Sequence, residues 1–329
     1  MRILFSFFAV IALVVSAYAG VKIANLQFLF GVAIPYIAVA IFIVGFIYRV
    51  LKWGNSPVPF RIPTTCGQQE SLPWIKQNKI ENPSGITGVI VRMALEVLLF
   101  RSLFRNLKTQ LNNGKLVYGE AKWLWLAGLA FHWSFLIIFV RHFRLFLENT
   151  PSFLKIIEGL DSFLQVGVPL LYMTDVVLLA AVTYLFLRRV FIPQVKYISL
   201  AADYFPLFLI FGIAASGVLM RYFYKVHIVG VKELAMGLVS LNPVIPQGIG
   251  VIFYIHLFLI SVLLAYFPLS KLMHMGGVFL SPTRNMANNS RMARHINPWN
   301  YPVHVHTYEE YENDFREKMK KAGIPVEKE

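Results

Sequence analysis

The sequence predicts an all-α membrane protein, a polytopic bundle of six transmembrane helices. Of its 329 residues, 57% are hydrophobic and only 15% are charged, whereas a soluble domain carries about 25% charged residues. Apolar runs of eighteen residues or more recur along the chain, and each is long enough to cross the ~30 Å hydrocarbon layer as a helix. The net charge of +14 fits basic loops on the cytoplasmic side of a membrane better than a nucleic-acid partner.

The six predicted spans start at the N-terminus and end with a long apolar run. They cover residues 3–19, 28–50, 121–146, 161–187, 204–220 and 250–275. The first span has Arg2 before it and Ala17-Tyr18-Ala19 after it. This pattern fits a cleaved signal peptide as well as a signal anchor, and we expect a retained helix.

Three parts of the chain follow from these spans. Residues 1–27 form an N-terminal membrane helix and connector, residues 28–277 form a five-helix core with a long loop at 51–120, and residues 278–329 form a polar tail. Residues 85–112 of the loop predict one amphipathic helix, because apolar residues recur there at alternating steps of four and three. In the tail, Thr307 and Glu310 form a capping-box pattern, and Gly323 is a plausible end of the helix that follows.

Six crossings place both chain termini on one side of the membrane. That side carries 24 of the 31 Lys and Arg residues, so the positive-inside rule predicts a multi-pass protein of the cytoplasmic membrane with cytoplasmic termini. The single cysteine, Cys66, excludes an intramolecular disulfide, a Cys-ligated iron–sulfur cluster and a CxxCH haem attachment within this chain. A redox cofactor must therefore be held by histidine or bound without covalent attachment.

Four histidines lie inside predicted spans. His256 and His274 are eighteen residues apart, which is five full helical turns, so both imidazoles leave one face of one helix about 27 Å apart. His132 and His142 lie ten residues apart on the third span. Ionisable residues in a membrane helix are costly and usually functional.

The depths of these histidines match in pairs. Three crossings separate the two spans, so the helices run antiparallel, and this pairs His132 with His274 and His142 with His256. Paired imidazoles on facing helices are typical of haem ligation, whereas zinc prefers four converging ligands. We therefore predict two haems, one near each membrane face. Taken singly, His142 and His274 could instead be interfacial residues that extend toward water.

Three further charged positions accompany the histidines. Arg141 and Arg144 lie near the expected edge of a haem and could bind its propionates, because guanidinium groups bind carboxylates in a bidentate manner. Asp175 lies in the middle of the fourth predicted span. It could fix helix packing through buried hydrogen bonds or act in a proton relay, and the sequence favours the first role.

The pattern of five helices with His-x9-His and His-x17-His resembles the cytochrome b (gamma) subunit family of respiratory nitrate reductases. Segments such as ADYFPLFLIFGIAASGVLMRY, FYIHLFL and AYFPLSKLMHMGGVFLSPTRNMANN more specifically resemble the DsrM family of membrane cytochromes b. These are subunits of the DsrMKJOP electron-transfer complexes of sulfite-reducing prokaryotes. The resemblance extends into the tail and spans nearly the whole chain.

The resemblance implies a subunit with two haem b groups that exchanges electrons with menaquinone. By motif position, His132 and His274 would bind the cytoplasm-side haem, and His142 and His256 the outer haem. The implied partners are a cytoplasmic iron–sulfur subunit similar to heterodisulfide reductase (DsrK-like), a periplasmic multihaem cytochrome c, further subunits of the complex, and membrane lipid. The nitrate reductase relatives use a lysine near the outer haem for quinone, and Lys155 and Arg144 are the candidates here.

The leading functional prediction is an electron-transfer subunit of an oxidoreductase complex linked to sulfite respiration, with a quinol-oxidising site near the outer haem. Two other classes fit the same histidines. One is a transporter or channel whose membrane histidines relay protons or bind metal. The other is a structural anchor for a soluble enzyme, in which haem serves assembly.

Overall fold

In the computed structural model, residues 1–56, 78–164, 169–287 and 304–328 are described. Five helical segments are long and apolar enough to cross a membrane, which confirms a polytopic helical bundle. They are α1 (Arg2–Lys22); the π-helical turn η1 (Leu29–Ala33) with α2 (Ile34–Gly54); α5 (Lys122–His142) with the 3-10 turn η2 (Phe143–Leu145); α9 (Ala201–Val218) with the π-helical turn η3 (Leu219–Phe223); and α11 (Val251–Tyr266) with the 3-10 turn η4 (Phe267–Leu269).

A sixth long helix, α7 (Met173–Phe191), packs between α5 and α9 and carries charged residues near both ends. The predicted start of this span at residue 161 is wrong. Residues Ser152–Asp161 form a separate amphipathic helix, α6, and α7 begins twelve residues after it ends. Pro169 lies between the two helices, where it lacks an amide donor and disfavours helix in the residue before it.

The direction of the helices alternates along the chain. Ser6 near the start of α1 donates to the Ala201 carbonyl at the start of α9 (2.9 Å), so these two helices are parallel. Arg141 at the end of α5 contacts Asp175 at the start of α7, so α5 and α7 are antiparallel. α11 packs against α1, α2 and α9 and runs opposite to α1 and α9.

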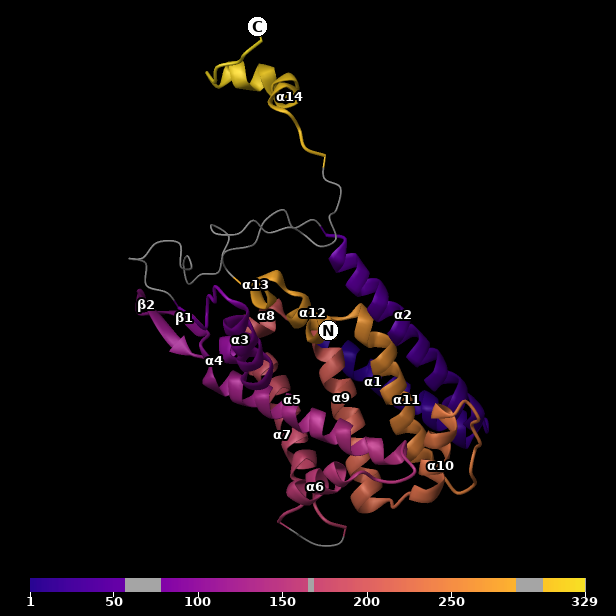
Figure 1. The fold of residues 1–329 in the computed structure, drawn as a ribbon. Coiled ribbons are helices and arrows are strands. Elements are labelled where there is room, and N and C mark those ends of the chain that lie inside the picture. Colours follow the sequence, from indigo (N-terminus) through magenta and orange to yellow (C-terminus); the bar gives the residue numbers. More distant parts are fainter. Residues whose placement is uncertain (57–77, 165–168, 288–303, 329) are drawn as a thin grey trace.

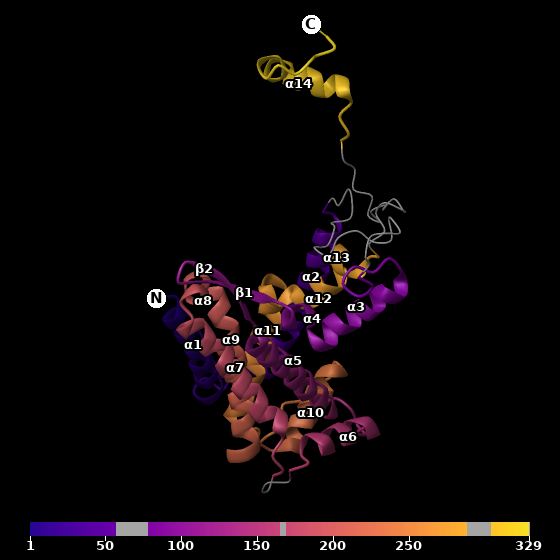
Figure 2. The same ribbon diagram turned by 90° about the vertical axis from the view of Figure 1, so that its left-hand side faces the viewer.

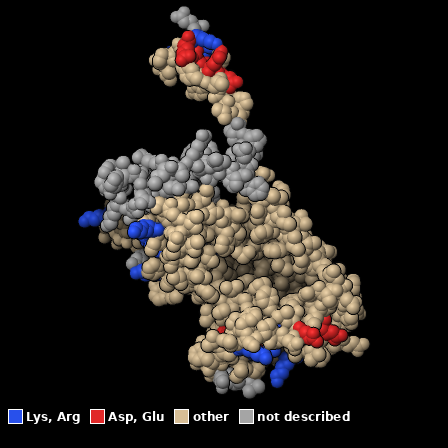
Figure 3. All heavy atoms as spheres, in the orientation of Figure 1, with Lys and Arg blue, Asp and Glu red and all other residues tan. Residues whose placement is uncertain are grey.

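The bundle has two ends that differ in the elements they carry (Figures 1 and 2). The near end is where α1 begins, and α8 (Pro193–Ile198), α12 (His274–Leu280) and α13 (Pro282–Asn285) lie there. The far end carries α6 and α10 (Ile228–Val239). On the face shown in Figure 3, charged side chains lie toward the two ends and an uncharged band lies between them, as expected of a protein with a hydrocarbon-facing middle.

The segment before α5 folds differently from the sequence prediction of one helix over 85–112. It forms α3 (Ile86–Leu99), the short helix α4 (Arg101–Phe104), and a hairpin of β1 (Leu107–Asn112) and β2 (Lys115–Glu120). The helix ends because Phe100 adopts a left-handed conformation (φ 50°). Asn113 and Gly114 both have positive φ, as the type I′ turns of two-residue hairpins require.

The last long apolar run is also interrupted, so the prediction of one continuous helix over 250–275 is wrong. α11 ends at Tyr266, and Ser270 is extended (φ −116°, ψ 179°) between η4 and the 3-10 turn η5 (Lys271–Met273). Pro268, which lies inside η4, has no backbone donor for a continuing helix. A new helix, α12, then begins at His274.

The tail helix α14 (Tyr308–Lys321) lies apart from the bundle (Figure 1). The predicted capping box is confirmed, since Thr307 and Glu310 each accept a backbone N–H from the other. Gly323 has φ 69° just after the helix, as predicted for its end. The buried Glu312 carboxylate accepts the backbone N–H groups of Glu327 and Lys328 (2.8 and 2.9 Å), so the tail folds back on itself.

Candidate functional site

Four histidines from two segments of the chain face one another in two pairs. The ring centres of His132 on α5 and His274 at the start of α12 are 5.9 Å apart, with the ring planes at 83°. Those of His142 at the end of α5 and His256 on α11 are 6.3 Å apart, with the planes at 18°. The structure therefore brings together the same pairs that the antiparallel arrangement predicts, although the run that carries His256 and His274 is broken between them.

Each of the four imidazoles uses its Nδ1 atom in a hydrogen bond. His132 and His142 donate to the carbonyls of Gly128 and Ile138 one turn earlier on α5, both at 2.7 Å. His274 donates to the Lys271 carbonyl at 2.9 Å. A carbonyl can only accept, so in these three rings Nδ1 carries a proton, and a neutral ring would have its lone pair on Nε2.

His256 reaches the same state through a side chain of another helix. Its Nδ1 lies 2.9 Å from the Ser216 hydroxyl on α9. That hydroxyl lies 2.8 and 2.9 Å from the carbonyls of Gly212 and Ile213 and can donate its one proton to either of them, which leaves its oxygen able to accept from Nδ1 of His256. Histidines that bind a metal through one nitrogen usually donate from the other to such an acceptor, which fixes the tautomer and the ring.

The spacing of the rings fits one metal ion between each pair. A metal–imidazole bond is roughly 2.0–2.1 Å and the bonded nitrogen lies roughly 1.1 Å from its ring centre, so two rings on opposite sides of one ion have centres roughly 6.3 Å apart. The observed 5.9 and 6.3 Å agree with this value. Each facing pair of imidazoles would therefore be able to hold one haem group, which would supply one-electron chemistry.

A site built only from protein ligands fits these pairs less well. Zinc sites use three or four protein ligands. Within the described ranges, the one group of three or more His, Cys, Asp or Glu side chains with converging ligand atoms lies in the tail, and neither membrane pair belongs to it. Figure 3 shows the molecule hollowed in the region where α9 and α11 lie side by side in Figure 1.

Two aromatic rings contact His132, which forms the near pair with His274. Phe100 contacts His132 edge-on at 4.9 Å between ring centres, as does Phe131 on α5 itself. Two indole groups of α5 hold α3 in place, because Trp125 and Trp133 donate to the carbonyls of Leu99 and Leu98 at 2.7 and 3.0 Å. The left-handed turn at Phe100 thus places an aromatic side chain of the loop against the site.

The far pair, His142 and His256, lies next to a buried ionic cluster that the sequence patterns did not predict. Arg141, the neighbour of His142, has an 8% exposed side chain. Its Nη2 donates to Asp175 at 2.7 Å, and its Nη1 lies 3.0 Å from Asp161, close enough for an ion pair although not aligned for a hydrogen bond. The Tyr222 hydroxyl donates to Asp175 at 2.9 Å.

Further contacts tie this cluster to four segments of the chain. Asp161 accepts the backbone N–H and the hydroxyl of Thr174 at 2.8 and 2.7 Å. The ring of Tyr172 lies between two guanidinium groups, with the Cζ atoms of Arg141 and Arg221 3.6 and 3.9 Å from its centre. The cluster therefore joins the end of α5, the end of α6, the start of α7 and η3. Asp161 is fourteen residues from Asp175, which is why the pattern of one helix could not connect them.

The remaining predicted residues lie at the far end without a described contact to the histidine rings. Arg144 is 44% exposed and pairs with Glu158 of α6 at 2.9 Å. Lys155 is exposed on α6. Arg141 is occupied by the two aspartates, so its predicted bond to a propionate, like that of Arg144, stays a prediction. Cys66 lies outside the described residues.

These features define a class, a polytopic helical membrane protein with two facing pairs of metal-competent histidines. The nitrate reductase gamma subunit family matches residues 85–294, a range that includes all four histidines, and the chain belongs to this family.

Two relatives from archaea are close over most of the chain. A protein of Archaeoglobus fulgidus is 46% identical over 278 residues, which cover 82% of this chain and 83% of that protein. One of Archaeoglobus profundus is 42% identical over 275 residues, 81% of each chain. Both are named Hdr-like menaquinol oxidoreductase cytochrome b-like subunit. The predicted resemblance is confirmed.

Proposed function

We propose that the chain is a membrane subunit with two haem b groups that transfers electrons between menaquinol and a cytoplasmic iron–sulfur partner. One observation carries this proposal. Two histidine pairs stand at different depths between α5 and the α11–α12 segment, at the ring spacing that one iron needs and with Nδ1 engaged in all four rings.

His132 and His274 would hold the near haem, and His142 and His256 the far haem. When bound, haem b supplies a one-electron carrier whose potential depends on axial ligands, burial and hydrogen bonds. The chain contributes the orientation of each imidazole through its Nδ1 acceptor. It also buries His256 of the far pair, which is 7% exposed.

The quinol site belongs at the far end in this proposal. The names of the two relatives support menaquinol as the electron donor, and the far end offers Arg144 and Lys155 on the surface beside the ionic cluster. With the near end in the cytoplasm, as the distribution of basic residues predicts, quinol oxidation would release protons to the outside.

The near end faces the proposed cytoplasmic partner. α3, α13 and the tail lie on that side (Figures 1 and 2), and the word Hdr-like in the names of the relatives supports an iron–sulfur subunit similar to heterodisulfide reductase. The resemblance to the DsrM family further supports a periplasmic multihaem cytochrome c in the same complex and a role in sulfite respiration.

Two measurements test the proposal. The purified protein should show the reduced-minus-oxidised absorbance bands of b-type haem, with two haems per chain. A menaquinol analogue should reduce them in isolated membranes. A spectrum without b-type bands contradicts the haem proposal and favours a transporter whose histidines relay protons or bind metal. Haem that quinol does not reduce favours a structural role in assembly.

A further inference from the structure

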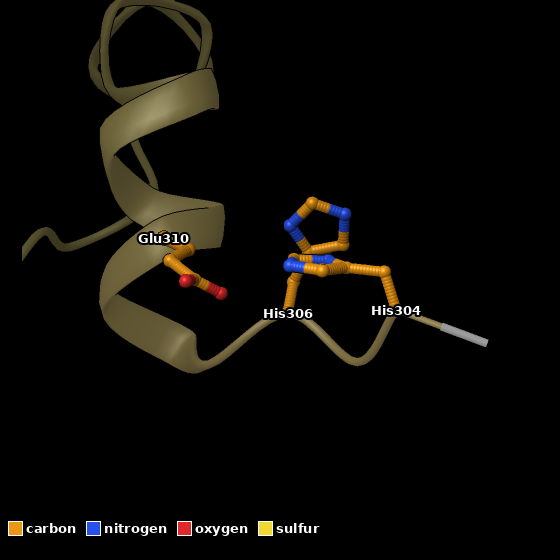
Figure 4. A group of neighbouring side chains, drawn as sticks. All are labelled: His304, His306 and Glu310. Atoms are coloured by element: carbon orange, nitrogen blue, oxygen red, sulfur yellow. The ribbon is translucent and has the colours of Figure 1, made fainter. Parts of the chain in front are cut away.

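The tail carries a second cluster of metal-ligating side chains, far along the chain from the membrane histidines. His304, His306 and Glu310 are all exposed, and one ligand atom of each lies within 4.8 Å of the others. Figure 4 shows the two imidazole rings side by side, with the Glu310 carboxylate pointing toward them. The ring centres of the two histidines are 4.6 Å apart.

Local structure holds the third side chain of this cluster in position. Glu310 is in the first turn of α14, and its Oε2 atom accepts the backbone N–H of Thr307 at 2.9 Å. Thr307 in turn accepts the backbone N–H of Glu310 through its hydroxyl. The capping box therefore fixes the carboxylate beside the residues that lead into the helix.

The chemistry of the three groups selects a class of ligand. Two neutral imidazoles and one carboxylate suit divalent transition metals such as Zn²⁺, Ni²⁺ and Cu²⁺. Bond lengths of roughly 2.0–2.2 Å to zinc place two ligand atoms of one tetrahedral site roughly 3.3–3.6 Å apart. The present separations, up to 4.8 Å, would have to shorten to this range, and the two exposed histidine side chains are the ones that must rotate to do so.

The charges around the cluster also bear on binding. The N-terminus of a helix disfavours a cation, and Glu309, the other carboxylate of the first turn, is paired with Lys328. The charge that attracts a metal ion must therefore come mainly from Glu310. This distinguishes a defined site from diffuse attraction to an acidic surface, in which Glu309 and Glu310 would contribute alike.

We propose that His304, His306 and Glu310 bind one divalent transition-metal ion, with water in the remaining position of a tetrahedral site. Three protein ligands and one open position are the arrangement of zinc sites that exchange a ligand. This site is separate from the haem proposal, because none of its residues touches the membrane histidines in the described structure.

Zn²⁺ binding to the full-length protein in detergent tests the proposal. A competing chromophoric chelator should report one equivalent of Zn²⁺ at pH 7.5, weakened at least about tenfold in His304→Ala/His306→Ala and in Glu310→Gln. Glu310→Gln is informative because glutamine retains the capping box, which circular dichroism of the helix can check. Glu309→Gln is the matched control and should leave the affinity unchanged.

Several outcomes would overturn the site. Equal losses in Glu309→Gln and Glu310→Gln indicate diffuse attraction, and full binding by the double histidine variant places the metal elsewhere. Binding that appears only at millimolar Zn²⁺ means an adventitious ion only. Affinity should also fall on acidification, because protons compete with the metal ion for its ligands, while the haem absorbance stays constant.

Discussion

The two histidine pairs share one design but differ in how the chain supports them. In both, an imidazole of α5 faces one from the C-terminal half of the core, and every Nδ1 is engaged. The far pair is stacked at 18° and includes the buried His256. The near pair is perpendicular at 83°, and both of its residues are partly exposed at the surface.

The difference follows from the elements around each pair. The far pair lies between regular helices, with Ser216 of α9 bound to His256 and the Arg141 cluster beside His142. The near pair depends on α12, which follows an interruption of the apolar run, and on Phe100 from the loop. These surroundings are consistent with the proposed quinol site at the far end and the proposed protein partner at the near end.

The largest expected effect comes from removing one ligand of each pair. His256→Ala should lose the far haem and keep the near haem, and His274→Ala should do the reverse, because in the proposed arrangement each pair would hold its own haem. Haem content and low-temperature absorbance spectra measure this. Added imidazole should restore the exposed near site of His274→Ala more readily than the buried far site of His256→Ala.

His227→Ala is the control for this prediction, since His227 caps α10 and belongs to neither pair. It should retain both haems. The pairing is wrong if His142→Ala and His256→Ala remove different haems.

A smaller effect is expected from breaking the ionic cluster at the far end. Arg141→Leu leaves Asp161 and Asp175 buried without their cation, which should destabilise the fold by about 3–5 kcal/mol. Arg144→Leu, at an exposed pair, should cost at most about 1 kcal/mol. Thermal unfolding in detergent compares them, and equal destabilisation by the two substitutions would contradict a special role of the cluster.

Next in size is the hydrogen bond that orients His256. Ser216→Ala should weaken far-haem binding by roughly 10–100-fold and shift the potential of that haem, with the near haem unchanged. Ser261→Ala is the matched control, because this buried hydroxyl bonds only the Leu257 carbonyl of its own helix. If a redox titration shows the potential of the far haem shifted equally in both variants, the effect of Ser216→Ala comes from packing alone.

The smallest effect concerns the ion pairs of Glu81 with Arg101 and Arg105, which connect the segment before α3 to α4 and the residue after it. Burial raises the pKa of Glu81, but its bonds to Arg101 and Arg105 outweigh this and hold the pKa below its usual value. The pairs therefore stabilise the fold above the ordinary carboxyl pKa, and this contribution is lost as pH falls through the lowered pKa.

Glu81→Gln should cost about 0.5–1 kcal/mol at pH 7, and its deficit relative to the unsubstituted protein should shrink on acidification toward pH 4. Thermal midpoints of both proteins across this range measure it. A deficit that is constant with pH would mean that the charge of Glu81 contributes nothing.

The sequence sufficed for the helical bundle and for the pairing of histidines, because apolar length and crossing number determine both. The predictions from sequence were wrong or incomplete where turn residues and contacts between helices determine the structure. The Asn113-Gly114 turn was a readable hairpin signal, but the four-three spacing of apolar residues hid it. Asp161 and Asp175 belong to different helices, so their meeting at Arg141 depends on a tertiary fold that periodicity does not encode.

The break at Ser270 also separates the two sites mechanically. A continuous helix would behave as a stiff rod, so a push on His274 would arrive at His256. Here the chain between them contains two short 3-10 turns joined by one extended residue, and a displacement of α12 can be absorbed by a few backbone torsions. A partner that docks at the near end, as proposed, could therefore displace His274 without changing the position of His256 at the far end.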